Sequence, residues 1–78
     1  MALIIGVMGL GGKATSDGIH EGVERLSKQY GWTGQTYTHI ARVGPTDLIR
    51  KHQGERIILV GNSLGVDAID DILEANPD

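Results

Sequence analysis

The chain has 78 residues, a formal net charge of −3 and no cysteine, which limits it to one small domain without disulfides or thiolate metal sites. Its basic residues are scattered and its apolar stretches are far too short for a membrane span, so we expect neither a nucleic-acid nor a membrane partner. The apolar N-terminus lacks the basic region and cleavage site of a signal peptide, and we therefore expect a cytoplasmic protein.

The first half of the chain predicts a buried strand followed by an amphipathic helix. Residues 2–8 form a nearly continuous apolar run, which is typical of a strand buried on both faces. A glycine-rich loop follows at residues 9–13. Apolar residues then recur at helical spacing from Ile19 to Tyr30, which predicts a helix over residues 17–30.

The second half predicts two further strand–helix units. Residues 35–40 are rich in Thr and Tyr and predict a polar strand suited to a sheet edge. The segment from Gly44 to Gly54 predicts a short helix, and residues 55–61 predict the third strand. The last helix is expected over residues 64–75, with its apolar face at Val66, Ile69, Ile72 and Leu73.

The order of elements is therefore βαβαβα, which predicts an α/β fold with a parallel sheet and right-handed crossovers. We expect strand order 2-1-3 in a three-layer arrangement, with the first helix on one face and the other two on the opposite face. Ligands bind such sheets at the carboxyl ends of the strands, beside the switch point between strands 1 and 3. The glycine-containing segments at residues 9–13 and 61–65 both fall at that edge.

Strand, tight turn and helix meet at residues 61–65, whose sequence GNSLG fits the Gly-x-Ser-x-Gly pattern of a nucleophile elbow. A serine on so tight a turn exposes its hydroxyl, and the flanking chain passes close to neighbouring backbone, where Gly61 and Gly65 fit. We therefore expect Ser63 to be a nucleophile. The N–H of Leu64, at the positive end of the next helix, is expected to stabilise an oxyanion. The simpler alternative is that Ser63 only caps this helix.

These motifs resemble the N-terminal part of an α/β-hydrolase of the lipase, esterase or thioesterase kind. The sequence MGLGG at residues 8–12 is similar to the His-Gly-x-Gly-Gly loop of that family, with Met8 in place of His. The resemblance covers nearly the whole chain. It implies that the N–H of Leu10 is a second oxyanion donor, in a loop shaped by Gly9 and Gly11. It also implies a small-molecule acyl ester or thioester as substrate, and no cofactor.

In that family the catalytic acid and histidine follow the elbow helix, beyond Asp78. We therefore expect residues 1–78 to form a single partial domain without a complete triad. His20 and His39 are the candidate bases, because both are predicted at the ligand edge. His39 would start about 10 Å from the elbow, at roughly 4.8 Å per strand, so solvated histidines are the simpler interpretation of both. His52 is expected to be a favourable cation at the end of the second helix.

A small nucleotide- or phosphate-binding module is the alternative function, with Gly9 to Lys13 as its loop. Residues 7–13 nearly match a P-loop, but Val7 stands where the first glycine is required, and Ala14 stands where a Ser or Thr would bind magnesium. The spacing of Gly9 and Gly11 also resembles a dinucleotide fingerprint, with Ala14 at the third position. Neither match explains Ser63.

A non-catalytic hydrolase fragment or interaction domain is the third possibility. The third strand is the most apolar of the three, yet order 2-1-3 leaves it on an open edge. We therefore expect self-association, or a missing C-terminal portion, along this strand. No metal is expected, because a solvated face is the simpler interpretation of the acidic residues of the last helix, which are Asp67, Asp70, Asp71 and Glu74.

Overall fold

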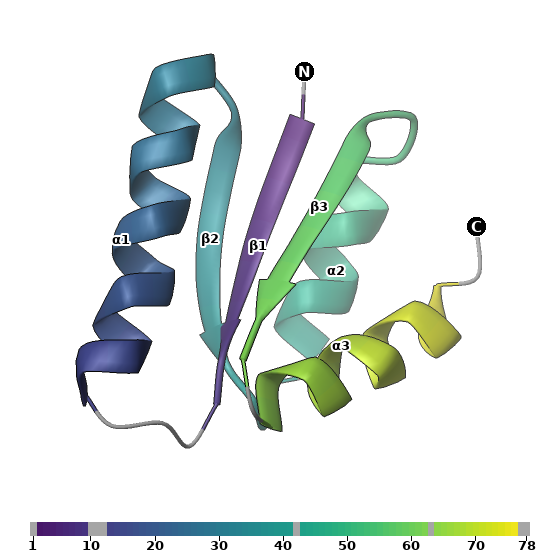
Figure 1. Cartoon of the computed structure of the whole chain (residues 1–78). Helices are drawn as coiled ribbons and strands as arrows, with labels where there is room; N and C mark the ends of the chain where they lie inside the picture. The colour runs from purple at the N-terminus through teal and green to yellow at the C-terminus, as the bar shows by residue number, and fades with distance from the viewer. Residues whose placement is uncertain (1, 10–12, 42, 63, 77–78) are drawn as a thin grey trace.

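The computed structural model of the chain describes residues 2–9, 13–41, 43–62 and 64–76 (Figure 1). Within these residues three strands alternate with three helices: β1 (Ala2–Met8), α1 (Lys13–Tyr30), β2 (Thr33–Thr38), α2 (Val43–Lys51), β3 (Arg56–Gly61) and α3 (Leu64–Ala75). The strands form one parallel sheet in the order β2-β1-β3. This confirms the predicted α/β class and strand order.

The central strand β1 is the core of the molecule. It pairs with β2 on one side and with β3 on the other, so that Ile5 lies opposite Gln35 and Leu59. Since both edges are paired and both faces are covered, an apolar side chain at nearly every position is favourable. The side chains of Leu3, Ile4, Ile5 and Val7 are accordingly fully buried.

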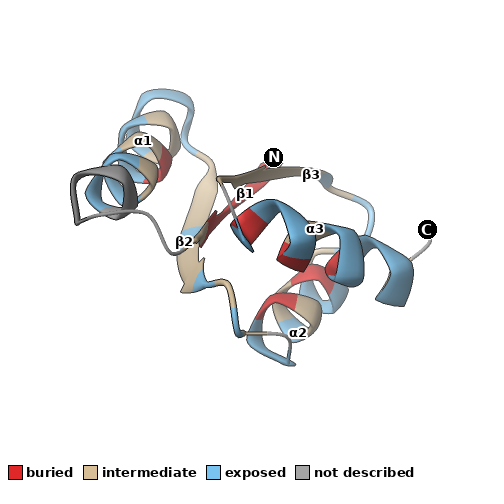
Figure 2. Cartoon of the chain, turned by 60° about the horizontal axis from the view of Figure 1, so that its bottom comes forward, coloured by how far each residue is buried: buried red, intermediate tan, exposed pale blue. Residues whose placement is uncertain are grey.

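The helices cover the two faces of the sheet in the predicted way (Figure 2). On one face α1 packs directly over β1, because a Cβ atom added to Gly6 would lie 2.8 Å from Val23 and 2.9 Å from Ile19. On the other face α2 and α3 enclose the main apolar cluster, whose buried members are Leu3, Ile5, Val7, Ile49, Ala68 and Ile72. The carboxyl ends of all three strands meet at the edge where α1, α2 and α3 begin (Figure 1).

Some predicted boundaries are wrong by several residues. Helix α1 begins at Lys13 and not at residue 17, because the apolar spacing that predicts this helix starts only at Ile19, and the polar residues before it are tolerated in a first helical turn. Strand β2 starts at Thr33, opposite Leu3, and ends two residues early, where the N–H of Ala41 donates to the carbonyl of Thr38 at 3.1 Å. Helix α2 ends at Lys51, before the tight turn that leads to β3.

The buried face of α3 also differs from the predicted one. Val66 and Leu73 are 48% and 52% exposed, although the apolar spacing placed both in the core. The side of α3 that meets the sheet contains Gly65, Ala68 and Ile72. The small residues Gly65 and Ala68 allow this helix to approach β1 closely, and this contact turns Val66 and Leu73 outward.

The described helices include none with the length and apolar character that crossing a membrane requires.

Candidate functional site

The turn between β3 and α3 is short and closed. Strand β3 ends at Gly61 and helix α3 begins at Leu64. The N–H of Gly65 donates a hydrogen bond to the carbonyl of Asn62 at 2.8 Å, which closes the turn at the start of the helix. Ser63, the predicted nucleophile, lies outside the described residues. The structure therefore describes the residues on either side of this serine, which are Asn62 and Leu64.

Gly65 lies directly against the backbone of the central strand. A Cβ atom added here would overlap the carbonyl oxygen of Val7 and lie 3.1 Å from its carbonyl carbon and 3.5 Å from the nitrogen of Gly9. These are backbone atoms at the end of a strand that is paired on both sides, so they cannot move aside cheaply. The first turn of α3 thus lies directly against the end of β1. Only glycine fits at position 65 without displacing the helix from this strand.

Gly61 is enclosed from the other side of the same turn. An added Cβ atom would lie 2.7 Å from Cδ1 of Ile69 and 3.1 Å from the carbonyl carbon and oxygen of Gly65. The Ile69 side chain could rotate, whereas the carbonyl of Gly65 is part of the first turn of α3. The two glycines that flank the Asn-Ser-Leu tripeptide therefore bring β3, α3 and the end of β1 into backbone contact.

Asn62 joins the two loops at the carboxyl edge of the sheet. The N–H of Gly9 donates to Oδ1 of Asn62 at 3.1 Å, in a partly buried position. The two residues are 53 positions apart in the chain. Our sequence interpretation treated Asn62 only as a variable position of the motif. Its signal was an amide side chain directly after an apolar strand, where it can satisfy a backbone N–H of the neighbouring loop.

We predict that Asn62→Ala lowers the free energy of unfolding by about 1 kcal/mol, because it leaves the N–H of Gly9 without its acceptor. Asn62→Asp is the matched control, because a carboxylate oxygen can still accept this hydrogen bond. Urea unfolding measures the stability, and the exchange rate of the Gly9 amide proton measures the contact itself. Equal exchange rates in Asn62→Ala and the parent chain would contradict this role of Asn62.

Of the two predicted oxyanion donors, Leu64 is among the described residues. Leu64 is the first residue of α3, and N–H groups in a first helical turn lack intrahelical acceptors and lie at the positive end of the helix dipole. Leu10 and Gly11 lie outside the described residues. Gly9 is described and contacts Asn62, so the start of the loop after β1 lies beside the turn that contains position 63.

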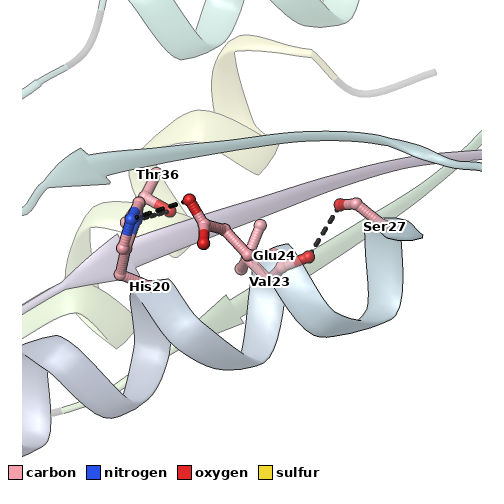
Figure 3. A network of polar contacts seen from close by, with 5 residues as sticks. All are labelled: His20, Val23, Glu24, Ser27 and Thr36. Carbon is pink, nitrogen blue, oxygen red and sulfur yellow. Dashed lines mark hydrogen bonds and ion pairs between the residues drawn. The ribbon is translucent and has the colours of Figure 1, made fainter. Parts of the chain in front are cut away.

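His20 faces β2, the strand farthest from the turn (Figure 3). Its Nδ1 lies 3.3 Å from Oγ1 of Thr36, and its Nε2 lies 3.1 Å from Oε1 of Glu24. A helix over residues 17–30 would have placed His20 in its first turn at the ligand edge, but α1 begins at Lys13, so this placement is wrong. The contact of Nδ1 thus connects α1 to β2, whereas that of Nε2 lies within α1.

The other two histidines are placed by the turns that follow β2 and α2. His39 comes directly after Thr38, the last residue of β2, and β1 lies between this strand and β3. His52 follows α2, and its Nδ1 lies 2.7 Å from Oε2 of Glu55. The expectation for His52 is therefore refined, because its ring has a specific carboxylate partner in the turn that leads to β3.

Two clefts flank the sheet. One, of about 520 Å³, lies between α1 and β2 and includes His20, Glu24 and Thr36. The other, of about 610 Å³, lies between β3 and the two helices on the opposite face. Among the described residues, neither cleft is lined by the turn at 61–65. The described His, Asp and Glu side chains form no group that could hold a metal ion, and the acidic residues of α3 are exposed.

The fold places the chain in the α/β class, and a hydrogen bond joins Gly9 after β1 to Asn62 after β3 at the carboxyl edge of the sheet. Comparison with protein-family models, curated proteins and solved structures finds no match to the chain.

Proposed function

We propose that this chain is a serine-hydrolase-like protein that acts on a carboxylic ester or thioester through Ser63. The contact between Gly65 and the backbone at the end of β1 is the observation that carries this proposal. A helix cap needs no such contact, whereas a nucleophile elbow requires the chain after the serine to pass close to neighbouring backbone. The absence of room for a Cβ atom at Gly65 therefore favours the elbow over a plain cap.

The hydrogen bond between Asn62 and Gly9 supports the second part of the proposed site, which is the oxyanion hole. An oxyanion hole of this kind needs donors from two loops, one N–H after the nucleophile and one from the loop after an early strand. Here the N–H of Leu64 is the proposed first donor, and that of Leu10 the second. This hydrogen bond holds the two loops against each other, one residue before the proposed donor Leu10 and two residues before the proposed donor Leu64.

The proposed reaction begins with attack of the Ser63 hydroxyl oxygen on the carbonyl carbon of the substrate. The carbonyl π electrons move to the oxygen, and the resulting oxyanion accepts hydrogen bonds from the two backbone donors. The proton of Ser63 must pass to a base. His20 is a poor candidate, because its ring nitrogens face Thr36 and Glu24, and His39 follows a strand that is not adjacent to β3. We therefore propose that residues 1–78 alone react slowly.

A fluorophosphonate probe tests the nucleophile. We expect slow labelling of the 78-residue chain at Ser63, and faster labelling of a chain extended by any residues that its coding region specifies after Asp78. A general base typically contributes orders of magnitude in rate, so the two chains should differ strongly. Mass spectrometry of the labelled peptide identifies the modified residue.

Two variants make the labelling experiment specific. Ser63→Ala should abolish labelling, whereas Thr36→Ala should retain it, although Thr36 is the hydroxyl that lies beside a histidine in the described structure. Labelling that survives in Ser63→Ala would exclude Ser63 as the nucleophile. If neither the chain nor its extended form is labelled, the hydrolase proposal is wrong and a non-catalytic role is favoured.

Phosphate binding at the loop after β1 is a second proposal, supported by the early start of α1. Because this helix begins at Lys13, the glycine-rich segment leads directly into a helix N-terminus, which is a favourable place for an anion. Titration with inorganic phosphate, followed by amide NMR, distinguishes the two functions. Shifts at Gly9, Lys13 and Ala14 without a change at Leu64 would favour the binding module.

A further inference from the structure

The outer side of β3 is an open strand edge. In the sheet order β2-β1-β3, this strand pairs with β1 alone among the described strands. The pairing runs without interruption from Arg56 opposite Ala2 to Gly61 opposite Val7, so no bulge bends the strand away. A regular edge of this kind presents backbone N–H and C=O groups to any strand that lies beside it (Figure 1).

Both faces of β3 are apolar. Ile58 and Val60 lie opposite Ile4 and Gly6, on the face toward α1, yet α1 packs mainly over β1 and β2. Ile57 lies on the other face, in the cleft beneath α2 and α3. A strand added to this edge would therefore meet apolar side chains on both of its faces.

Apart from the exposed Arg56 at its start, β3 lacks the devices that normally prevent strand addition. Residues 57–61 contain no charged residue and no proline, and charges at edge positions are the usual protection. The opposite edge strand, β2, has the sequence TGQTYT and is mostly polar. The two edges of the sheet thus differ, and only that of β3 offers an apolar surface with a regular backbone.

We propose that β3 pairs with β3 of a second copy of this chain, antiparallel and across a two-fold axis perpendicular to the sheet. The added strand must be apolar on both faces, and β1 and β3 are the described strands with this property. Because β1 is already paired on both sides, β3 of another copy is the strand that remains. This two-fold axis places the face that α1 covers in one copy beside the same face of the other copy. Ile58 and Val60 of the two copies therefore lie side by side on that face.

Sedimentation measures this association, which is independent of the proposed hydrolase function. We expect the 78-residue chain to form a dimer at micromolar concentration, and Ile58→Lys to weaken the dimer at least tenfold. A lysine placed at the centre of an edge strand brings like charges together across the axis. Val43→Lys is the matched control, because Val43 is 74% exposed at the start of α2, away from the β3 edge, and should leave the dimer unchanged.

Cysteine cross-linking tests the pairing itself. The chain contains no cysteine, so a single introduced cysteine can form a disulfide only with a second copy. Facing residues at the two-fold axis of an antiparallel pair lie close enough for this bond, whereas residues further along the strand move apart in opposite directions. Single cysteines at positions 57 to 60 should therefore cross-link rapidly at one or two adjacent positions and more slowly at the others. In Val43→Cys the disulfide between the two copies should form only slowly.

Three results would overturn the proposal. A monomer that melts cooperatively at all concentrations would show that the edge does not recruit a second copy. A dimer with equal cross-linking at all four positions and at residue 43 would show that the copies meet elsewhere. A chain that becomes monomeric when extended beyond Asp78 would show that another segment covers β3. If Ile58→Lys fails to fold, the cross-linking pattern still decides between these results.

Discussion

Gly65→Val is expected to be the most damaging single substitution at the candidate site. A side chain at this position overlaps the carbonyl oxygen of Val7, and the overlap can be relieved only by moving α3 away from the central strand. Overpacking of this kind costs about 3 kcal/mol, and more where backbone must move. A domain of this size has little stability to lose, so we expect the variant to be largely unfolded at room temperature.

Two other substitutions serve as comparisons for the loss of stability in Gly65→Val. Ser63→Ala removes at most a cap worth about 1 kcal/mol, so it should be clearly milder than Gly65→Val in urea unfolding. Gly22→Ala is the control for glycine replacement itself. Gly22 is in the interior of α1 with no atom within 4 Å of an added Cβ, so alanine should stabilise the helix by about 1 kcal/mol. If Ser63→Ala proves more damaging than Gly65→Val, the elbow interpretation is wrong.

The arrangement of the sheet was predictable because its signals are local. The apolar run of β1 and the polar composition of β2 are each contained in a short segment. Alternation with helices then leaves few arrangements, because crossovers between parallel strands are right-handed. The need for small residues at Gly61 and Gly65 was also predictable, since it follows from the tight turn between a strand and a helix.

The contacts that join distant segments were not predictable. The hydrogen bond between Asn62 and Gly9 depends on β1 and β3 being neighbours in the correct register. One partner of His20 is Thr36, on another element, and this pairing depends on how α1 lies across β2. Helical periodicity locates an apolar face but cannot show how closely a helix approaches the sheet. This limit explains why the buried face of α3 was misplaced.

Ile72→Ala should have the second largest effect among these predictions, and it tests the corrected face of α3. The side chain of Ile72 is fully buried in the cluster with Leu3, Ile5 and Val7. Removing it leaves a cavity between α3 and the sheet, which typically costs about 3 kcal/mol. Leu73→Ala is the matched control from the next position of the same helix. Because Leu73 is half exposed, its loss should cost about 0.5 kcal/mol.

Urea unfolding of both variants, at a concentration low enough to exclude association, measures the difference between these neighbours. Helical spacing alone treats Ile72 and Leu73 as members of one apolar face and predicts similar losses for the two. The described packing predicts a large loss for Ile72→Ala and a small one for Leu73→Ala, because Gly65 and Ala68 set the side of α3 that meets β1. Similar losses would mean that α3 packs by its larger residues, and the close contact between Gly65 and Val7 would then be wrong.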